Sequence, residues 1–408
     1  MTASESGTPD VDVVCLGESM VTFRPSRPGR LAEVPSFDRG IGGAESNVAC
    51  ALAAAGHRTR WIGRVGADGF GDHVVETIAA YGVDVTAVQR DPRRPTGIYF
   101  RTAGERPMTV PAGGPLGVRA ALSGTDAPGA RPEARAAERP VRAPGSAEPP
   151  AWGEVAYYRA GSAASAMAPG LVPRETAWAG RVLHLTGITA ALSAGCLALL
   201  HDLTAPGPGR PFVSFDVNYR AGLWQDAADG PEVLAALARR CDLVLVGEDE
   251  AQAAWGLRGA DAVRAALPEP EIVVVKRGAA GATAYVREPG GAGPDGAAAR
   301  APRARSADRA VSVPALRVDV VAPVGAGDAF AAGFLSGTLR GLPVEERLRH
   351  GHLMAAAALT TPGDLAAPPA RGYVDRLAAL DDEAWGALRL GPGWTGRPEA
   401  RTATGEAR

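Results

Sequence analysis

The chain has 408 residues, of which 46% are apolar, and its formal net charge is −2. This length is enough for one large domain or about two to three average ones. The near-neutral charge gives no electrostatic reason to expect nucleic acid or an anionic membrane as a partner. The cysteines form no Cys-x-x-Cys pair, and they are Cys15, Cys50, Cys196 and Cys241. We expect them to be buried, reduced thiols of a cytosolic protein.

The first ten residues lack the apolar region of a signal peptide and are not expected to be one. They are polar, and we expect residues 1–10 to be a disordered N-terminus. No apolar run approaches the roughly 18 residues that a membrane span requires. The sequence therefore predicts a soluble, cytoplasmic protein.

Apolar runs of strand length alternate along the chain with helical patterns that end at glycine. The predicted strands are residues 11–18, 58–66, 182–187, 212–218, 243–247 and 272–278, and the helices include residues 42–56 and 71–82. Near-continuous apolar strands separated by helices indicate a mainly parallel sheet that is covered on both faces. The predicted fold class is therefore α/β.

Two segments have the composition of insertions. Residues 102–150 and about 288–310 are rich in Ala, Pro and Gly and cannot bury enough surface to offset the entropy of ordering them. We expect both to be disordered or loose. The end of the chain, residues 386–408, is expected to be a flexible tail. What remains of residues 11–385 fits one α/β domain.

Polar residues follow the apolar runs at their carboxyl ends, where parallel sheets bind ligands. They are Glu18, Asp216, Asn218, Glu248, Glu250 and Lys276. Each of them alone is equally typical of an ordinary polar strand end, so the pattern leaves both interpretations open.

Residues 320–335, VVAPVGAGDAFAAGFL, combine small residues with one carboxylate before an apolar pattern at helical spacing. The unpartnered amides of a helix that begins at Gly325, Ala326 and Gly327 could hold a phosphoryl group. Asp328 in the first turn could then accept a proton from a substrate hydroxyl. The spacing excludes a Walker A loop and a dinucleotide fingerprint. By itself the motif is also typical of a helix start with a stabilising acidic residue.

GAGDAFAAGFL resembles the C-terminal signature of the ribokinase-like (PfkB) sugar kinases. GGAESNVACALAAAG, followed by WIGRVGADGFG, resembles a second signature of that family, and both occur in the expected order. The resemblance covers about residues 11–377 apart from the two insertions. Within the family the chain is most similar to 2-keto-3-deoxygluconate kinases, in the segments PTGIYFR, YYRAGSAASA, LHLTGI, FDVNYRAGLW and VVVKRGAAGA.

This resemblance implies a Rossmann-like three-layer sandwich with a small β-sheet lid, formed by about residues 19–40 and 97–160. It implies Mg²⁺- and ATP-dependent phosphorylation of a sugar-acid hydroxyl, and we expect a homo-oligomer with no nucleic-acid or membrane partner.

The resemblance also assigns roles to individual residues. Asp328 would be the catalytic base and Gly325, Ala326 and Gly327 the anion hole; Gly43, Asn47, Tyr99, Tyr157, Arg159 and Arg220 would bind substrate; Lys276, Gly278, Gly325, Gly327 and His352 would bind nucleotide; Glu250 would organise Mg²⁺ through water. The chemistry agrees, because a guanidinium binds a carboxylate bidentately. Surface arginines, strand-packing tyrosines and a solvent-facing lysine remain the alternative interpretations.

Three positions depart from the pattern of the family. Ala322 stands where the kinases usually have Asp, and without that carboxylate no monovalent-cation dependence is expected. Gly247 replaces an Asn ahead of Glu250, whose magnesium role other carboxylates could share. His352 replaces an Asn beside the adenine, where it could serve as a planar partner or face solvent.

Two alternatives to a sugar-acid kinase remain. One is a kinase of a neutral sugar, of the fructokinase or ribokinase type, in which Arg159 and Arg220 would have no anionic ligand. The other is a non-catalytic sugar-binding regulator with the same fold, favoured by the departures at Ala322 and Gly247.

Overall fold

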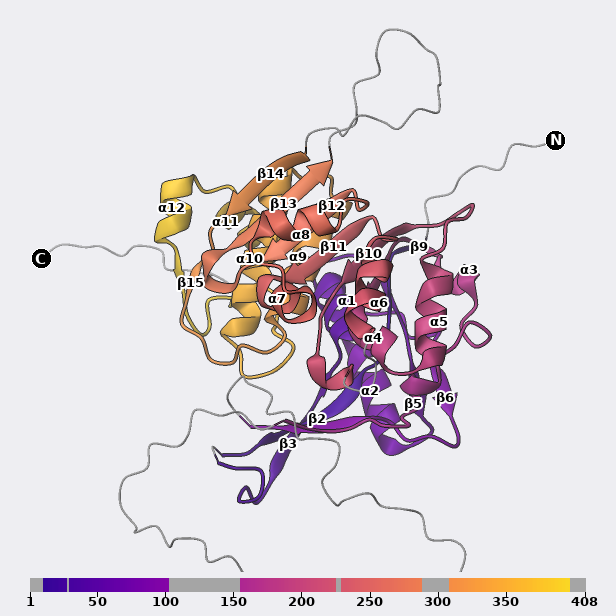
Figure 1. The fold of residues 1–408 in the computed structure, drawn as a ribbon. Coiled ribbons are helices and arrows are strands. Elements are labelled where there is room, and N and C mark those ends of the chain that lie inside the picture. Colours follow the sequence, from indigo (N-terminus) through magenta and orange to yellow (C-terminus); the bar gives the residue numbers. More distant parts are fainter. Residues whose placement is uncertain (1–9, 28, 103–154, 225–228, 288–307, 397–408) are drawn as a thin grey trace, which may run out of the picture.

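The computed structural model describes residues 10–27, 29–102, 155–224, 229–287 and 308–396, and it is organised around an eight-stranded sheet (Figure 1). In spatial order the strands are β14 (Asp308–Val313), β13 (Ala282–Arg287), β12 (Ile272–Lys276), β11 (Leu243–Gly247), β10 (Phe212–Asp216), β9 (Gly180–Thr186), β1 (Val11–Leu16) and β4 (Thr59–Ile62). From β12 to β4 neighbouring strands are parallel, whereas β13 and β14 are antiparallel. The prediction of a mainly parallel α/β sheet is confirmed.

Both faces of this sheet are buried, because successive side chains of a strand point to opposite faces. On β1, Val13 and Cys15 join one apolar core, while Val14 and Leu16 join the other. The first core lies under α1 (Ala44–Ala54), α2 (Gly69–Ala80), α9 (Ala326–Leu339), α10 (Val344–Leu359), α11 (Arg371–Ala378) and α12 (Asp382–Ala387). The second lies under α3 (Arg174–Ala177), α4 (Gly187–Ala191), α5 (Ala194–Leu203), α6 (Gly230–Ala238), α7 (Glu248–Trp255) and α8 (Ala260–Ala266).

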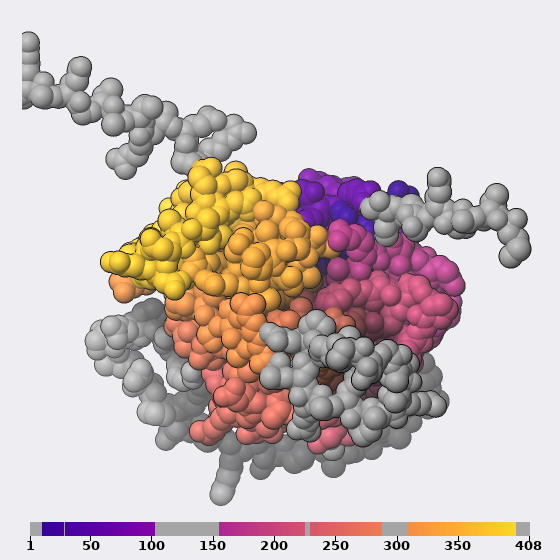
Figure 2. Space-filling model, turned by 90° about the horizontal axis from the view of Figure 1, so that it is seen from above, coloured from indigo at the N-terminus to yellow at the C-terminus, as the bar shows by residue number. Residues whose placement is uncertain are grey.

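Segments from the two ends of the chain meet on one side of the molecule. Helix α1 packs against α9, and Figure 2 shows the indigo N-terminal surface directly beside the orange and yellow C-terminal surface. This contact brings the two sequence signatures together, since each of them begins one of these helices.

A separate four-stranded sheet lies apart from the main sheet (Figure 1). Its strands, in spatial order, are β3 (Phe37–Gly42), β2 (Met20–Pro25), β7 (Ile98–Arg101) and β8 (Val155–Tyr158). They come from the two segments for which the resemblance implies a lid. Alternation places Tyr99 and Arg101 on the buried face of β7 and Phe100 on the other.

Smaller elements complete the chain. They are the pairs β5 (Arg64–Gly66) with β6 (Gln89–Asp91) and β15 (Arg317–Val318) with β16 (Arg389–Leu390), and the 3₁₀ turns η1 (Ala164–Ala166), η2 (Ala221–Leu223) and η3 (Gly278–Ala280). Residues 58–66, predicted as one strand, form β4 and β5, because the chain leaves the main sheet at Gly63 to pair with β6.

Two predicted boundaries differ from the structure. Residues 308–310, expected to end the second insertion, belong to β14, where Asp308 receives two hydrogen bonds from Arg264 at 2.7 and 2.8 Å. Residues 386–396, expected to be a tail, include β16, and the indole of Trp394 donates to Thr360 Oγ1 at 3.1 Å. Residues 1–9, 103–150, 288–307 and 397–408 lie outside the described part of the chain.

Among the helices that the structure describes, none is both long and apolar enough to cross a bilayer.

Candidate active site

Charged side chains meet at the carboxyl edge of the main sheet. Asp216 ends β10 and Lys276 ends β12, and Lys276 Nζ donates to both carboxylate oxygens of Asp216 at 2.8 and 3.0 Å. Burial alone would lower the pKa of Lys276, but the carboxylates of Asp216 and Glu250 raise it, so the ammonium stays charged. A fixed cation therefore stands at the edge where parallel sheets bind ligands.

The N-terminus of α9 opens beside this cation. Gly325 caps the helix in the left-handed region, with φ of 75°, and Asp328 lies in the first turn. A Cβ at Gly325 would overlap the backbone carbonyl of Asp364, so only glycine fits. Lys276 Nζ lies 3.6 Å from where a Cβ on Gly327 would be. A helix N-terminus beside an ammonium group is an arrangement that can bind an anion.

Asp328 is held by Asn47, a residue of α1. The Asn47 amide donates to Asp328 Oδ2 at 2.8 Å, while Asn47 Oδ1 is buried and accepts no hydrogen bond from the described residues. Burial raises the pKa of Asp328 to about 7; the charge of Asp216 also raises it, against the Asn47 bond and the cations of Lys276 and Arg220. A carboxyl poised near neutrality suits a general base.

Glu250 and Arg220 form the next charged pair. Arg220 Nη1 donates to Glu250 Oε1 at 3.3 Å, and the Gly247 amide donates to Glu250 Oε2 at 3.0 Å. Burial raises the pKa of Glu250, although Lys276 and Arg220 oppose the rise. The side chain of Arg220 is 49% exposed, so its guanidinium can reach a ligand without leaving the site.

Arg159 is engaged more deeply. Its Nη2 forms an ion pair with Glu18, its side chain is 11% exposed, and its guanidinium lies 5.7 Å from the centre of the Tyr157 ring. Ser162 Oγ also donates to Glu18, at 2.7 Å. The structure therefore places Arg159 in a largely buried position rather than on the open surface, with a protein carboxylate as its partner.

The two predicted tyrosines differ in their surroundings. They pair across β7 and β8 with ring centres 5.4 Å apart. Tyr157 is 51% exposed, whereas Tyr99 is buried and its hydroxyl donates to Asp364. Gly43, the cap of α1, has extended backbone, and a Cβ there would overlap the Glu18 carbonyl. Gly43 therefore lets the backbone of α1 approach the backbone at Glu18 closely.

A cavity of about 740 Å³ adjoins the other side of the α9 N-terminus. The predicted nucleotide residues that line it are Lys276, Gly278, Gly327 and His352, together with Ala326 of the predicted anion hole. His352 is buried rather than solvent-facing: its Nε2 lies 3.3 Å from the Val313 carbonyl oxygen, and burial lowers its pKa to about 4. The ring is therefore neutral at physiological pH.

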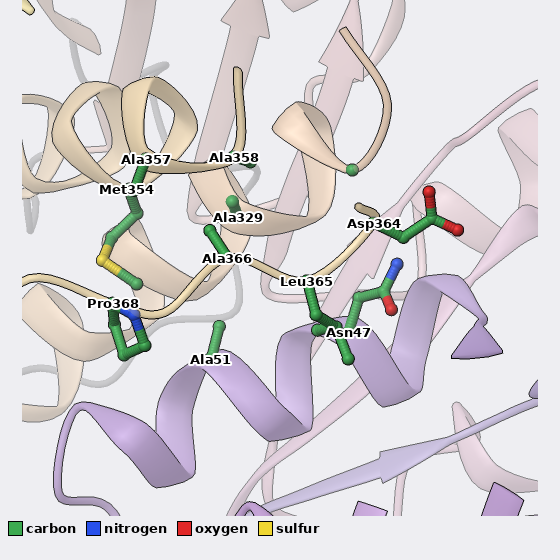
Figure 3. Close-up of a pocket in the computed structure, with 11 residues that line it drawn as sticks. Asn47, Ala51, Ala329, Met354, Ala357, Ala358, Asp364, Leu365, Ala366 and Pro368 are labelled. Atoms are coloured by element: carbon green, nitrogen blue, oxygen red, sulfur yellow. The ribbon is translucent and has the colours of Figure 1, made fainter. Parts of the chain in front are cut away.

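A second, much smaller pocket of about 20 Å³ lies behind Gly325 (Figure 3). Figure 3 shows Asn47 and Asp364 at one end of this pocket and Met354 and Pro368 at the other. The pocket separates α1 from the segment that follows α10. At Ala322 there is no carboxylate, and its amide donates to the Leu359 carbonyl at 3.2 Å.

Sequence reasoning missed three buried charged residues, Glu45, Arg101 and Asp364. Thr186 and Thr189 each donate to Glu45 Oε1 at 2.7 Å. Arg101 follows Tyr99 at strand spacing on β7, so alternation alone could have placed it facing inward. Glu45 stands in the first turn of helix α1, where alternation does not apply, so the sequence carried no such signal for it. Nothing in the local sequence around Asp364 indicates its partners.

Comparison with known proteins agrees with this geometry. Residues 10–115 and 154–371 match the pfkB family carbohydrate kinase profile. The chain is 30% identical over 378 residues to 2-dehydro-3-deoxygluconokinase of Bacillus subtilis (strain 168), covering 91% of this chain and 95% of that protein. It is 30% identical over 370 residues to 2-dehydro-3-deoxygluconokinase of Thermoproteus tenax, covering 90% and 94%. The crystal structure of a PfkB protein from Polaromonas sp. JS666 matches with a TM-score of 0.65 and 28% identity, over 90% and 99% of the two chains.

The chain belongs to the pfkB family of carbohydrate kinases. It is a phosphotransferase whose fold is ribokinase-like, and the predictions of family, fold class and enzyme class are confirmed. Within the family it is similar to proteins named 2-dehydro-3-deoxygluconokinase.

Proposed function

We propose that the chain transfers the γ-phosphoryl group of ATP to a hydroxyl of 2-keto-3-deoxygluconate or a closely related sugar acid. The observation that carries the proposal is that Asp328, held by Asn47, lies in the first turn of α9, beside the N-terminal amides of that helix. Both relatives at 30% identity carry the name of this activity.

In this proposal Asp328 accepts the proton of the attacking hydroxyl. Its pKa of about 7 leaves a substantial ionised fraction at neutral pH while keeping the carboxylate basic enough to take a proton. The amides of Gly325, Ala326 and Gly327 stabilise the charge on the transferred group, and the Lys276 ammonium adds a fixed positive charge. Asn47 Oδ1, which has no described partner, can accept a hydrogen bond from the sugar.

The cavity of about 740 Å³ is large enough for a nucleotide, with His352 and Phe330 on its apolar wall and Gly327 at the phosphate end. Among the described residues, no group of three or more His, Cys, Asp or Glu side chains is arranged to hold a metal ion directly. Mg²⁺ keeps several waters and binds substrate phosphates, so in this proposal Glu250 would contact it through water. Mg²⁺ would neutralise phosphate charge.

The substrate carboxylate would be bound by a guanidinium. Arg220 is half exposed and paired at 3.3 Å, so its guanidinium can bind a sugar acid, while the largely buried Glu250 keeps its hydrogen bond from the Gly247 amide. Arg159 is held by Glu18 and orients Tyr157 at the pocket. The exposed phenol of Tyr157 and the close backbone approach at Gly43 shape the rest of the sugar site.

Further parts of the proposal concern the whole protein. We propose that the small sheet of β2, β3, β7 and β8 acts as a lid that excludes water. The protein would be cytoplasmic and homo-oligomeric, and would not require a monovalent cation, since Ala322 supplies no carboxylate.

The proposal is tested with the purified chain, Mg²⁺-ATP, and a panel of sugar acids and neutral sugars, by measuring ADP release and sugar phosphate. We expect turnover with 2-keto-3-deoxygluconate or a close relative. Faster turnover of fructose or ribose would favour the neutral-sugar kinase. Binding of sugars without turnover would favour the regulator.

The arginines separate the two kinase alternatives. Arg220→Ala should raise KM for the sugar acid by about 10- to 100-fold, because a charge-assisted hydrogen bond to the carboxylate is lost. Arg159→Ala should lower kcat/KM through Glu18 and Tyr157. Arg210→Ala, which removes an Arg–Asp pair at the amino end of β10, is the matched control. Unchanged kinetics in both site variants would exclude the sugar-acid proposal.

A further inference from the structure

We propose that Asp364 is a positioning residue that couples the small sheet to the glycine N-terminus of α9. It does so by holding Tyr99 and Arg101 with its side chain while its backbone lies against Gly325. The inference rests on the proposed function only for its activity measurement. The coupling itself concerns the chain without any ligand.

The side-chain contacts of Asp364 join two segments of the chain. The Tyr99 hydroxyl donates to Asp364 Oδ2, and Arg101 Nη2 lies 2.6 Å from Asp364 Oδ1. Tyr99 and Arg101 come from the inward face of β7, and all three residues are buried. Each carboxylate oxygen therefore has a partner on the small sheet, one neutral and one charged.

The backbone of Asp364 meets the anion-binding turn. A Cβ on Gly325 would overlap the Asp364 carbonyl, and one on Gly42, at the end of β3, would overlap the Tyr99 hydroxyl and approach Asp364 Oδ2 within 2.5 Å. Gly325, Asp364 and Asn47 also line the same small pocket (Figure 3). Gly42 thus lies against the carboxylate of Asp364, and Gly325 lies against its main-chain carbonyl.

A second tie joins the same two parts. Arg24, on β2 of the small sheet, donates from Nη1 to the Pro362 carbonyl at 2.8 Å. Two strands of the small sheet therefore hold the segment that follows α10, and that segment supports Gly325. This tie is more exposed than the Asp364 cluster.

Because of these contacts, the small sheet and the turn at Gly325 cannot easily move independently of each other. If β7 moved alone, it would leave Asp364 or Arg101 as an unpaired buried charge, which is strongly unfavourable. Movement of β7 must therefore carry the Asp364 segment with it and change the position of the Gly325 amide. The position of the small sheet and the geometry of the phosphoryl-binding turn are in this way linked.

The cluster also gives Tyr99 a role different from the predicted one. Its hydroxyl is buried and already donates its one proton to Asp364, so it cannot donate to a sugar as well. Tyr157, its neighbour across the strand pair, has the exposed phenol. The specific consequence is that Tyr99→Phe should affect kcat more than KM for the sugar.

The test uses the full chain and the variants Tyr99→Phe and Asp364→Asn. Each is expected to lower kcat about tenfold with KM for ATP changed by less than about twofold, because the turn is misplaced rather than removed. In the double variant the losses should not add, because both act through one link. Asp308→Asn, which weakens the Arg264–Asp308 pair far from the site, is the matched control.

Hydrogen exchange provides a readout that does not depend on the substrate. In the ligand-free protein, the amides of residues 322–330 should exchange faster in Tyr99→Phe and Asp364→Asn than in the parent. In Asp308→Asn their exchange rates should equal those of the parent. If the parent lacks kinase activity but this exchange pattern is found, the proposed function fails and the coupling stands. Unchanged exchange and kcat in both site variants would overturn the coupling, as would equal effects in Asp308→Asn.

Discussion

Asp328 occupies a site in which the neighbouring cations are already paired with carboxylates. Lys276 pairs with Asp216, Arg220 with Glu250, and Arg159 with Glu18. Because these charges are balanced pairwise, the net field on Asp328 is small, and burial dominates its protonation. Burial therefore raises the pKa of Asp328 to about 7, whereas an unpaired lysine beside it would lower that pKa.

The pH dependence of turnover follows from this value. Below a pH of about 7 Asp328 of the free enzyme is mainly protonated and cannot accept a proton, so kcat/KM for the sugar should rise about tenfold per pH unit and level off above that pH. The measurement is a pH profile of kcat/KM by ADP release at sugar concentrations well below KM.

Asp328→Asn is the control for this prediction. It keeps the size and the contact with Asn47 but should lower kcat by about 10²- to 10⁴-fold and remove the rise with pH, while sugar binding by calorimetry persists. A normal pH profile in Asp328→Asn would mean that another group is the base.

At the scale of single elements, helix α1 buries a carboxyl group, and this burial disfavours the charged form of that group. Its first turn buries Glu45 completely, and burial raises the pKa of that carboxyl to about 7, although the hydrogen bonds from Thr189 and Thr186 and the charge of Arg159 oppose the rise. The Glu45 carboxylate has thus lost more hydration than it regains from the helix N-terminus, the two threonines and Arg159. The folded protein binds this proton more tightly than the unfolded chain does.

The sign of the stability effect follows by linkage. A carboxyl whose pKa is higher in the folded state contributes stability that is fully present below about 4.5 and is lost as the pH rises to about 7. The free energy of unfolding of the parent should therefore fall across this window by up to about 1.4 kcal/mol per pH unit more than that of Glu45→Gln.

Urea unfolding at several pH values in this window measures the difference. Glu45→Gln keeps an amide oxygen for Thr186 and Thr189, and Glu33→Gln on the surface is the control. If the stability of Glu45→Gln varied with pH in parallel with the parent, Glu45 would not be the titrating group.

On the scale of the whole molecule, the strands at the two ends of residues 103–154 are already paired with each other. β7 and β8 pair antiparallel, with Arg101 opposite Val155, so the ends of that segment are already adjacent. Replacing residues 103–154 by an Asn-Gly turn of about two to four residues keeps every described strand pair.

We expect this shortened chain to fold and to keep kcat within about threefold of the parent, because every described residue of the site remains. Its free energy of unfolding should rise by about 2 kcal/mol, since closing a shorter loop costs less entropy. Urea unfolding and ADP release measure both, and the parent is the control. Loss of activity in a folded, shortened chain would assign residues 103–154 a part in catalysis.

Much of the fold could be predicted because its signals are local. The apolar runs of β1, β9, β10, β11 and β12 are buried on both faces and lie where the pattern predicts them, and α1 and α2 end before glycines. Boundaries set by pairing could not be found this way: β14 and β16 consist of residues with little apolar periodicity, and their partners β13 and β15 determine where they begin.

The chemistry of the site divides in the same way. The family follows from two short signatures that occur together and in order. The turn at Gly325–Asp328 by itself is equally typical of an ordinary helix start, so its proposed role depends on the second signature. The partner of Asp328 was not predicted: the sequence assigned Asn47 to the substrate, and only the structure brings it to Asp328, 281 residues away in the chain.

By itself the sequence determined the α/β class, the family and the residues from which the site is built, since periodicity and motif chemistry are properties of neighbouring residues. Only the tertiary structure decided which charges pair. Arg159 faces Glu18 rather than standing free, Tyr99 is committed to Asp364, and burial moves the pKa of Asp328 to about 7. The pairing of charges and the burial of Asp328 depend on which distant segments of the chain pack together, and local sequence patterns do not predict that packing.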